Sequence, residues 1–333
     1  MSKAAVTAST KFNFDELKAL TDGDIQRVNQ VIIDNLASPV ALINQLSRHI
    51  ILSGGKRLRP MLVMLAAKSC LYVGDDDALL ASVVEFIHTA TLLHDDVVDD
   101  SDMRRGQKTA SNIWGNEAAV LVGDYLYSRA FQMMVRAHSM RIMELLSNTT
   151  NTIAEGEVKQ LLNVRDPDTS EIQYHDVIYG KTACLFEAAT RIGAILAGAD
   201  TRVENDLAHY GKHLGIAFQL IDDTLDYNAD SEQIGKNVGD DLAEGKPTLP
   251  LIRALEVGSP SQQSLIREAI TEGNADQFEQ VKDIILSTGS LDYCFQQARE
   301  QARLAQESIE HLPDSPYRDA LHFLADYAVE RSH

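Results

Sequence analysis

The stretch Val83–Asp99, VVEFIHTATLLHDDVVD, is an apolar helix-like run that ends in three aspartates, and Leu214–Asp226, LGIAFQLIDDTLD, repeats the pattern. On a helix, residues four apart share a face, so Asp95 lies next to Asp99. In the second stretch, Asp222 lies next to Asp226 for the same reason. Two carboxylates about 4 Å apart repel by roughly 4 kcal/mol at an effective dielectric constant near 20. A chain that carries this arrangement twice is expected to bind cations there. Sites made only of carboxylate oxygens suit Mg2+ bridging to phosphate better than zinc.

Two polar residues extend these triads along their helices. The triads themselves are Asp95, Asp96 and Asp99, and Asp222, Asp223 and Asp226. His88 lies seven residues before Asp95, close to two helical turns, and so continues the polar stripe. Gln219 lies three residues before Asp222 and faces the same region. One triad alone is often a solvated helix end, and one histidine is often core. Two triads that each follow an apolar run favour a metal site.

Basic residues cluster beside both triads although the chain is acidic. It has 30 Lys and Arg against 49 Asp and Glu, a formal net charge of -19, which disfavours nucleic acid and anionic lipid as partners. A helix amino terminus that carries Lys and Arg suits phosphate. The clustered basic residues are Lys56, Arg57 and Arg59 after Gly54-Gly55, Arg104 and Arg105 after the first triad, Lys181 inside an apolar run, and Lys236 and Lys246 after the second triad. Singly these are ordinary surface charges, but together they predict polyanionic ligands held partly through metals. No Walker loop is present.

Helical periodicity covers most of the 333 residues, and alternating strand patterns are missing. The predicted helical stretches are 24–52, 61–72, 78–98, 118–135, 140–164, 177–197, 203–227, 248–255, 262–271, 277–286, 291–312 and 317–331. No Pro-, Ser- or Gly-rich linker marks a domain boundary. We therefore expect one all-α domain over residues 24–333, preceded by a mobile N-terminal extension at residues 1–23.

Composition and cysteine content predict a cytoplasmic protein. Hydrophobic residues make up 44% of the chain, which is normal for a globular core. Cys70, Cys184 and Cys294 are an odd number without CxxC spacing, so free thiols in a reducing compartment are expected. The first residues lack a signal-peptide pattern, and no run approaches the ~18 apolar residues of a membrane helix.

These motifs resemble those of the trans-prenyl diphosphate synthase family, also called polyprenyl synthetases. The matching segments are both aspartate-rich motifs, Gly54–Pro60, Arg104–Gly106, Lys181-Thr182, and Gly235–Asp241 with Glu244–Thr248. The match runs in order from Gln26 to Arg331. Within the family, the stretches Glu85–Gly106 and Ala130–Met134 look most like bacterial octaprenyl diphosphate synthases.

The resemblance implies a fold, a metal and a set of binding residues. It implies an all-α helical bundle of the isoprenoid-synthase type around a deep central cavity, usually in a homodimer. Several Mg2+ ions, three per site, would be held by Asp95, Asp99 and Asp222, and the six aspartates and Lys181 would be catalytic. The resemblance assigns the allylic diphosphate to Arg104, Lys181, Thr182, Gln219, Lys236 and Lys246. It assigns isopentenyl diphosphate to Lys56, Arg57, Arg59, His88 and Arg105.

The implied reaction condenses an allylic diphosphate, expected to be farnesyl, with successive isopentenyl diphosphates. The product would be all-trans octaprenyl diphosphate for respiratory quinone side chains such as that of ubiquinone, released through transient membrane contact. Ala90 and Thr91, five and four residues before Asp95, are small and would let a growing chain pass. Candidates for the floor of the tunnel are Phe131, Met133 and Met134, each of which could equally be ordinary core. Farnesyl, geranylgeranyl, heptaprenyl or solanesyl products remain alternatives, as do a terpene cyclase and a non-catalytic partner subunit.

Overall fold

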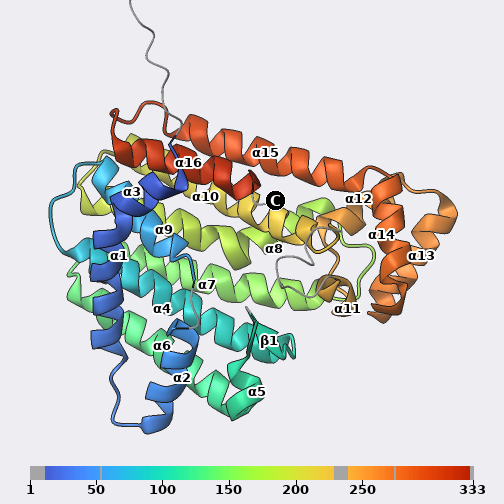
Figure 1. Ribbon diagram of the computed structural model, residues 1–333, viewed down its shortest axis with the longest axis horizontal. Coiled ribbons are helices and arrows are strands. Elements are labelled where there is room, and N and C mark those ends of the chain that lie inside the picture. Colours follow the sequence, from blue (N-terminus) through green and yellow to red (C-terminus); the bar gives the residue numbers. More distant parts are fainter. Residues whose placement is uncertain (1–11, 53–54, 105, 229–238, 274, 331–333) are drawn as a thin grey trace, which may run out of the picture.

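The computed structural model describes residues 12–52, 55–104, 106–228, 239–273 and 275–330, and Figure 1 shows how they are arranged. Regular structure in these residues is almost entirely helical, which confirms the all-α fold class. The exception is a small antiparallel hairpin, β1 (Met103–Arg104) and β2 (Gln107–Lys108). It pairs Met103 with Lys108 and Arg104 with Gln107, directly after the first aspartate triad.

The helices follow one another with short connections. In the described residues, the helices up to Ala183 are α1 (Phe14–Leu36), α2 (Ala41–Leu52), α3 (Leu58–Ser69), α4 (Asp76–Val98), α5 (Ala110–Trp114), α6 (Asn116–Arg136), α7 (Met140–Asn163), α8 (Glu171–Ile178) and the π-helix η1 (Tyr179–Ala183). The remainder are α9 (Cys184–Leu196), α10 (Thr201–Leu225), α11 (Asp240–Ala243), α12 (Leu249–Val257), α13 (Pro260–Glu272), the 3-10 helix η3 (Ala275–Gln277), α14 (Phe278–Ser287), α15 (Ser290–Ser308) and α16 (Pro316–Glu330).

The longest helices form the body of the molecule. In Figure 1, α7, α10 and α15 run along its long axis, and α10 packs extensively against α9 and α15. On the other side of α9, α3 packs against α4, which in turn packs against α6. The side chains that fill the space between these helices form one large apolar core. This packing sets α4 and α10, the two helices that carry the aspartate triads, on a common scaffold.

A second, smaller group of buried apolar residues lies among the C-terminal helices. It includes Leu251 of α12, Ile266 of α13 and Ile285 of α14, together with Tyr227 directly after α10. Figure 1 shows these helices gathered at one end of the molecule. Because Tyr227 belongs to this group, the end of α10 is held in place from both sides.

The N-terminal helix begins earlier than the sequence predicted. Helix α1 begins at Phe14, where Asn13 and Glu16 form a reciprocal capping box, and Leu17 is buried. Residues 14–23 therefore belong to the helical body and not to the extension expected at residues 1–23. The predicted stretch 24–52 is also two helices, because Pro39 follows the end of α1 and proline disfavours helical geometry before it.

A membrane-spanning helix is not found among the described residues. None of these helices combines the length and the apolar character that crossing a bilayer demands.

Candidate active site

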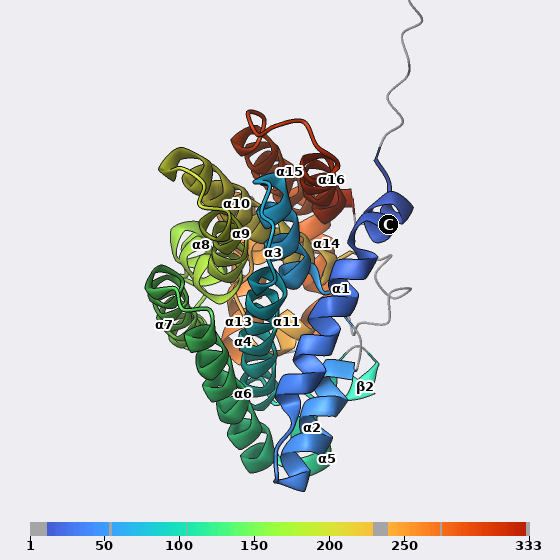
Figure 2. The same cartoon turned by 90° about the vertical axis from the view of Figure 1, so that its left-hand side faces the viewer.

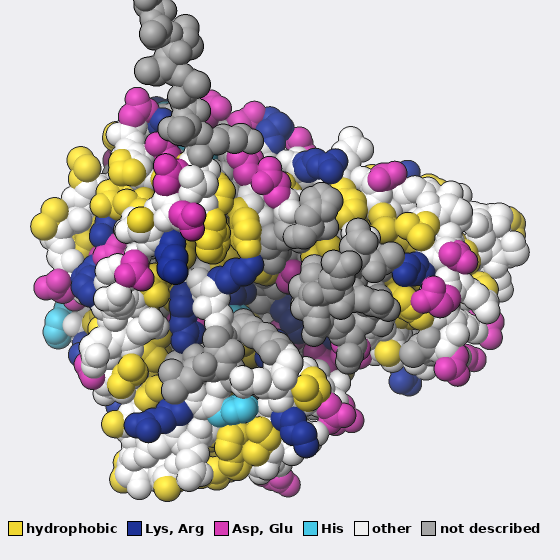
Figure 3. Space-filling model, viewed as in Figure 1, with side chains coloured by type: hydrophobic (Ala, Val, Ile, Leu, Met, Phe, Trp, Pro, Cys, Tyr) yellow, Lys and Arg dark blue, Asp and Glu magenta, His cyan; other side chains and the backbone are white. Residues whose placement is uncertain are grey.

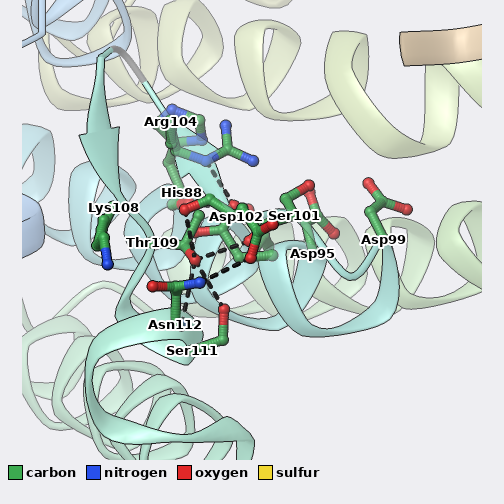
Figure 4. Close-up of polar contacts among 12 residues, drawn as sticks. His88, Asp95, Asp99, Ser101, Asp102, Arg104, Lys108, Thr109, Ser111 and Asn112 are labelled. Carbon is green, nitrogen blue, oxygen red and sulfur yellow. Dashed lines mark hydrogen bonds and ion pairs between the residues drawn. The ribbon is translucent and has the colours of Figure 1, made fainter.

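Both aspartate triads lie at the carboxyl ends of helices. Asp99 is the residue that caps α4, and Asp226 caps α10. Figure 4 shows Asp95 and Asp99 projecting from the same side of α4. The last carbonyl groups of a helix carry partial negative charge, so carboxylates there are disfavoured and cations are attracted. The helix dipoles thus add to the mutual repulsion of the carboxylates, and both effects favour bound positive charge.

Two lysines from distant segments supply positive charge to the first triad. Lys181 of η1 has its Nζ 3.5 Å from Asp95 Oδ2, and Lys246 Nζ donates to Asp99 Oδ2 at 3.0 Å. Burial lowers the pKa of Lys181, but the neighbouring carboxylates raise it by more, so its net shift is upward. Both ammonium groups therefore stay charged beside the aspartates.

The π-helix η1 connects the two triads. Lys181 contacts Asp95 of the first triad, while the next residue, Thr182, donates to Gln219 Oε1 at 2.8 Å. Gln219 Nε2 in turn donates to Asp223 Oδ1 of the second triad at 2.7 Å. A π-helix is rare and is frequently found at functional sites. Here, consecutive side chains of η1 reach toward different triads.

The middle aspartate of each triad is held by protein donors. Asp96 is 1% exposed and accepts from Arg104 Nε at 2.7 Å. Burial raises the pKa of Asp96, and the charge of Arg104 opposes this. Asp223 accepts from Tyr174 Oη at 2.6 Å and from Gln219. Burial raises the pKa of Asp223 to about 6, against the opposing effect of these two hydrogen bonds.

Asp226, the last aspartate of the second triad, holds the start of the segment that follows it. Its two carboxylate oxygens accept the backbone N–H groups of Gly239 and Asp241, each at 3.1 Å. Gly239 and Asp241 lie at the start of α11, just before Lys246. Asp226 therefore helps to place the segment from which Lys246 reaches Asp99.

The basic segment at the start of α3 lies against α4 and α16. Arg59 Nη1 is 3.0 Å from His88 Nε2, and Arg57 forms an ion pair with the buried Glu85 of α4. Lys56 contacts the hydroxyl of Tyr327 in α16, and its Nζ lies 4.8 Å from that ring centroid. The structure thus places His88 next to Arg59, a residue with which the family resemblance groups it. Arg105 and Lys236, which the sequence also singled out, lie outside the described residues.

The residues predicted to line a product tunnel lie on α4 and α6, which pack together. Ala90 is fully buried, and Thr91 is half-buried with its hydroxyl donating to the carbonyl of His88. On α6, Phe131 is half-buried and stacks on Tyr127 with ring centroids 6.3 Å apart. Met133 and Met134 are fully buried.

Several residues at the site were not singled out from the sequence. Glu157 of α7 accepts from Lys181 Nζ at 2.9 Å, and burial raises its pKa to about 7. Tyr174 holds Asp223, and Glu85 pairs with Arg57. Each contact joins residues 24 to 49 positions apart, so sequence spacing gives no signal of it. The one feature of the nearby sequence that could have drawn attention to Glu157 is Gly156, the glycine directly before it.

The residues present fit a divalent cation that is shared with a ligand. Within the part of the chain that the structure describes, three or more Asp, Glu, His or Cys side chains do not converge closely enough to hold a metal unaided. Mg2+ usually takes one or two carboxylates and completes its shell with water and phosphate oxygens. The aspartates that contact lysine ammonium groups, Asp95 and Asp99, already bind positive charge and supply suitable oxygen ligands.

Positive side chains also gather around this region on the surface. On the face shown in Figure 3, Lys and Arg side chains form a group near the middle of the molecule, although the chain as a whole is strongly acidic. Such a local group raises the concentration of anions near the site against the overall repulsion.

Comparison with known proteins gives one consistent family. The family model described as polyprenyl synthetase matches residues 40–286. The chain is 53% identical over 320 residues to octaprenyl diphosphate synthase of Escherichia coli strain K12, covering 96% of this chain and 99% of that protein. It is 47% identical over 309 residues to an all-trans-nonaprenyl-diphosphate synthase (geranyl-diphosphate specific) of Rhodobacter capsulatus, covering 92% and 95%.

A solved structure agrees with these sequence relatives. The crystal structure of polyprenyl synthase from Caulobacter crescentus CB15, complexed with calcium and isoprenyl diphosphate, superposes with a TM-score of 0.93 at 43% identity. The superposition covers 98% of this chain and 100% of that one. Together with the paired aspartate triads and the basic residues around them, these matches show that the chain belongs to the polyprenyl synthetase family.

Proposed function

We propose that the protein is a long-chain trans-prenyltransferase that makes all-trans octaprenyl diphosphate. It condenses an allylic diphosphate, farnesyl diphosphate as starter, with successive molecules of isopentenyl diphosphate and releases one diphosphate at each step. The observation that carries this proposal is the pair of aspartate triads, one contacted by Lys181 and the other linked through Gln219 to Thr182. Near full-length similarity to an octaprenyl diphosphate synthase supports the product class.

Divalent metal ions belong to this family's chemistry, and we propose Mg2+ here, with three ions per site. Asp95, Asp99 and Asp222 are the proposed ligands. When bound, Mg2+ neutralises the negative charge that develops on a departing diphosphate. The tightly hydrogen-bonded Asp96 and Asp223 are proposed to act by holding Arg104 and Gln219 in place.

Residues of the chain bind and orient the two substrates. Around the allylic diphosphate we place Arg104, Lys181, Thr182, Gln219, Lys236 and Lys246. Around isopentenyl diphosphate we place Lys56, Arg57, Arg59, His88 and Arg105. The proximity of Arg59 to His88 and of Lys181 to Asp95 supports these two groupings. Arg and Lys side chains fixed in this way stabilise the charge of the leaving group without reorganising.

The bond changes follow from this arrangement. The C–O bond between the allylic carbon and the diphosphate breaks, and the diphosphate keeps the electron pair. The double bond of isopentenyl diphosphate supplies the electrons for a new C–C bond to the allylic cation. A proton then leaves the adjacent carbon to form the new trans double bond, and the released diphosphate accepts it. The apolar walls of the site keep water from the cation.

The number of added units is proposed to depend on residues of α4 and α6. Ala90 and Thr91 leave room beside the first triad, and Phe131, Met133 and Met134 are proposed to close the tunnel further along. Because α4 and α6 pack together, bulky side chains on α6 are suitably placed to block a chain that runs along α4. We also propose that the protein is cytoplasmic, and that its product is released through transient membrane contact and becomes the side chain of a respiratory quinone.

A homodimer is also proposed, through the exposed apolar faces of α6 and α7. Figure 2 shows α6 and α7 along one outer edge of the molecule. Both helices expose large apolar side chains, namely Val120, Leu121, Val158, Leu161 and Leu162. An apolar surface of this kind is typical of a protein interface. Light scattering coupled to size-exclusion chromatography tests the stoichiometry, and a mass of 36.7 kDa would contradict the dimer.

One assay tests the proposed reaction. The purified chain is incubated with farnesyl diphosphate and radiolabelled isopentenyl diphosphate, and the dephosphorylated products are sized. We expect Mg2+-dependent incorporation into a product of eight isoprene units. A farnesyl or geranylgeranyl product would contradict the proposed length. Conversion of the allylic substrate alone would indicate a cyclase, and no activity from the single chain would indicate a partner-dependent subunit.

A further inference from the structure

Helix α7 and the π-helix η1 are in direct backbone contact near the first triad. A Cβ atom added to Gly156 would lie 2.7 Å from the carbonyl carbon of Gly180 and from the backbone nitrogen of Lys181. A Cβ added to Gly180 would lie 2.9 Å from the Cα of Gly156. Any other residue at either position would separate the two segments. The glycine pair therefore allows Glu157 and Lys181, the residues that directly follow the two glycines, to approach each other closely.

Lys181 is shared between Glu157 and Asp95. Lys181 Nζ lies 2.9 Å from Glu157 Oε2 and 3.5 Å from Asp95 Oδ2. The second oxygen, Oε1, is buried and has no hydrogen-bond donor among the described residues. Leaving a buried carboxylate oxygen without a hydrogen-bond donor is unfavourable, because the group loses its hydration and gains no partner. Such groups are few in native proteins, and a catalytic role is one of the reasons for them.

The same arrangement occurs at the second lysine of the site. Lys246 contacts Asp99 Oδ2 at 3.0 Å and also forms an ion pair with Glu244, which lies outside the aspartate motifs. Each lysine thus has two carboxylate partners, one triad aspartate and one glutamate. Both glutamate side chains are half-buried.

We propose that Glu157 and Glu244 are positioning residues that hold Lys181 and Lys246 beside the allylic diphosphate when cations engage Asp95 and Asp99. This inference rests on the proposed function and adds two residues that the motif-based assignment does not contain. A lysine whose only anionic partner is an aspartate competes with the cation for that carboxylate. A lysine that also contacts a glutamate can lose its contact with the aspartate to the cation and still be held in place by the glutamate.

Removing the charge of Glu157 should change how Lys181 interacts with Asp95. Glu157→Gln keeps the shape of the side chain but removes its charge, so Lys181 is drawn toward Asp95. The lysine then opposes cation binding at Asp95 and is less available to the diphosphate. Loss of one charged hydrogen-bond partner corresponds to about a tenfold or greater change in an equilibrium constant.

Binding of an unreactive ligand tests the proposal without turnover. The probe is farnesyl thiolodiphosphate, in which sulfur replaces the bridging oxygen, titrated with Mg2+ into the full chain by calorimetry. We expect Glu157→Gln to weaken binding about tenfold, and Glu244→Gln to act similarly through Lys246. The matched control is Glu155→Gln on the same helix, whose exposed side chain accepts from Asn151, and it should change binding less than about twofold.

A double-mutant cycle shows whether Glu157 acts through Lys181. In a Lys181→Gln background, Glu157→Gln should weaken binding less than about twofold further, because the partner it positions is gone. Equal weakening in both backgrounds, or wild-type binding by Glu157→Gln, would overturn the proposal. If Glu157→Gln does not fold, Glu244→Gln in wild-type and Lys246→Gln backgrounds decides it by the same criteria. Failure of the wild-type protein to bind the probe would instead contradict the proposed function.

Discussion

Lys246 Nζ lies 3.0 Å from Asp99 Oδ2, although 147 positions separate the two residues in the chain. The contact joins the segment after the second aspartate triad to the end of the first. Asp226 helps to place the segment that carries Lys246, because its carboxylate accepts two backbone N–H groups at the start of α11. Direct contacts therefore link the two motifs, as is expected of one site and not of two independent helix ends.

Removing the charge of Lys246 should impair the allylic half of the reaction. For Lys246→Gln we expect kcat/KM for farnesyl diphosphate to fall about 100-fold, because a preorganised cation beside the leaving group is lost. The KM for isopentenyl diphosphate should stay within about twofold. Steady-state kinetics with each substrate varied in turn provides the measurement. Lys159→Gln, an exposed change on α7, is the control, and a similar loss in that variant would contradict a specific role for Lys246.

The fold and the aspartate motifs could be predicted because their signals are local. Apolar residues at helical spacing define the helices, and aspartates four apart share a face wherever the helix lies. The partners of those aspartates could not be predicted. Tyr174 reaches Asp223 only because α8 and α10 pack together, and Glu157 reaches Lys181 only through the Gly156–Gly180 contact.

The π-helix was missed for a similar reason. A run of apolar residues around Lys181 predicts a continuous helix, and one additional residue per turn leaves no compositional mark. Its effect becomes visible when Lys181 and Thr182 are seen to reach different triads. The early start of α1 was missed because the charged residues near Asn13 obscure its apolar face, of which Leu17 is the buried member.

Shortening a side chain at the proposed tunnel floor should lengthen the product. We expect Phe131→Ala or Met134→Ala to shift the product from eight isoprene units toward longer chains, because the blocked volume becomes accessible. Met140→Ala removes a methionine that is 76% exposed and should leave the product unchanged. Mass analysis of the dephosphorylated products distinguishes these outcomes. An unaltered product from Phe131→Ala, Met133→Ala and Met134→Ala alike would place the floor elsewhere.

The glycine contact between α7 and η1 should be intolerant of a methyl group. Gly156→Ala should destabilise the protein by about 1–3 kcal/mol, since overpacking against backbone atoms forces the segments apart. Gly23→Ala is the matched helical control, because a Cβ there meets nothing within 4 Å and alanine is the better helix former. Thermal unfolding of both variants measures the difference. A Gly156→Ala variant as stable as Gly23→Ala would show that the contact can relax.

Stability should respond to pH through His213 of α10. Burial lowers the pKa of His213 below its ordinary value of 6.5, with Lys212 and His209 adding to the shift and Gln301 and Glu187 opposing it. The unfolded chain therefore binds this proton more readily. The stabilising contribution is present above pH 6.5 and is lost as the pH falls below it.

A His213→Gln variant isolates this effect. Between pH 7.5 and pH 5.5, the midpoint of thermal unfolding should fall more for the wild type than for the variant. Taking the difference between the two pH values for each protein cancels any constant cost of the substitution. If both midpoints move equally, the histidine does not titrate differently in the folded and unfolded states.

The central claim is that three aspartates of the two triads, Asp95, Asp99 and Asp222, act by gathering divalent cations around a departing diphosphate. The most direct measurement is incorporation of labelled isopentenyl diphosphate by the wild type and by Asp95→Ala, before and after exhaustive chelation and after adding Mg2+ back. We predict that chelation abolishes incorporation, that Mg2+ restores it in the wild type alone, and that Asp95→Ala retains a helical circular dichroism spectrum. Undiminished incorporation by the chelated wild type would contradict the account.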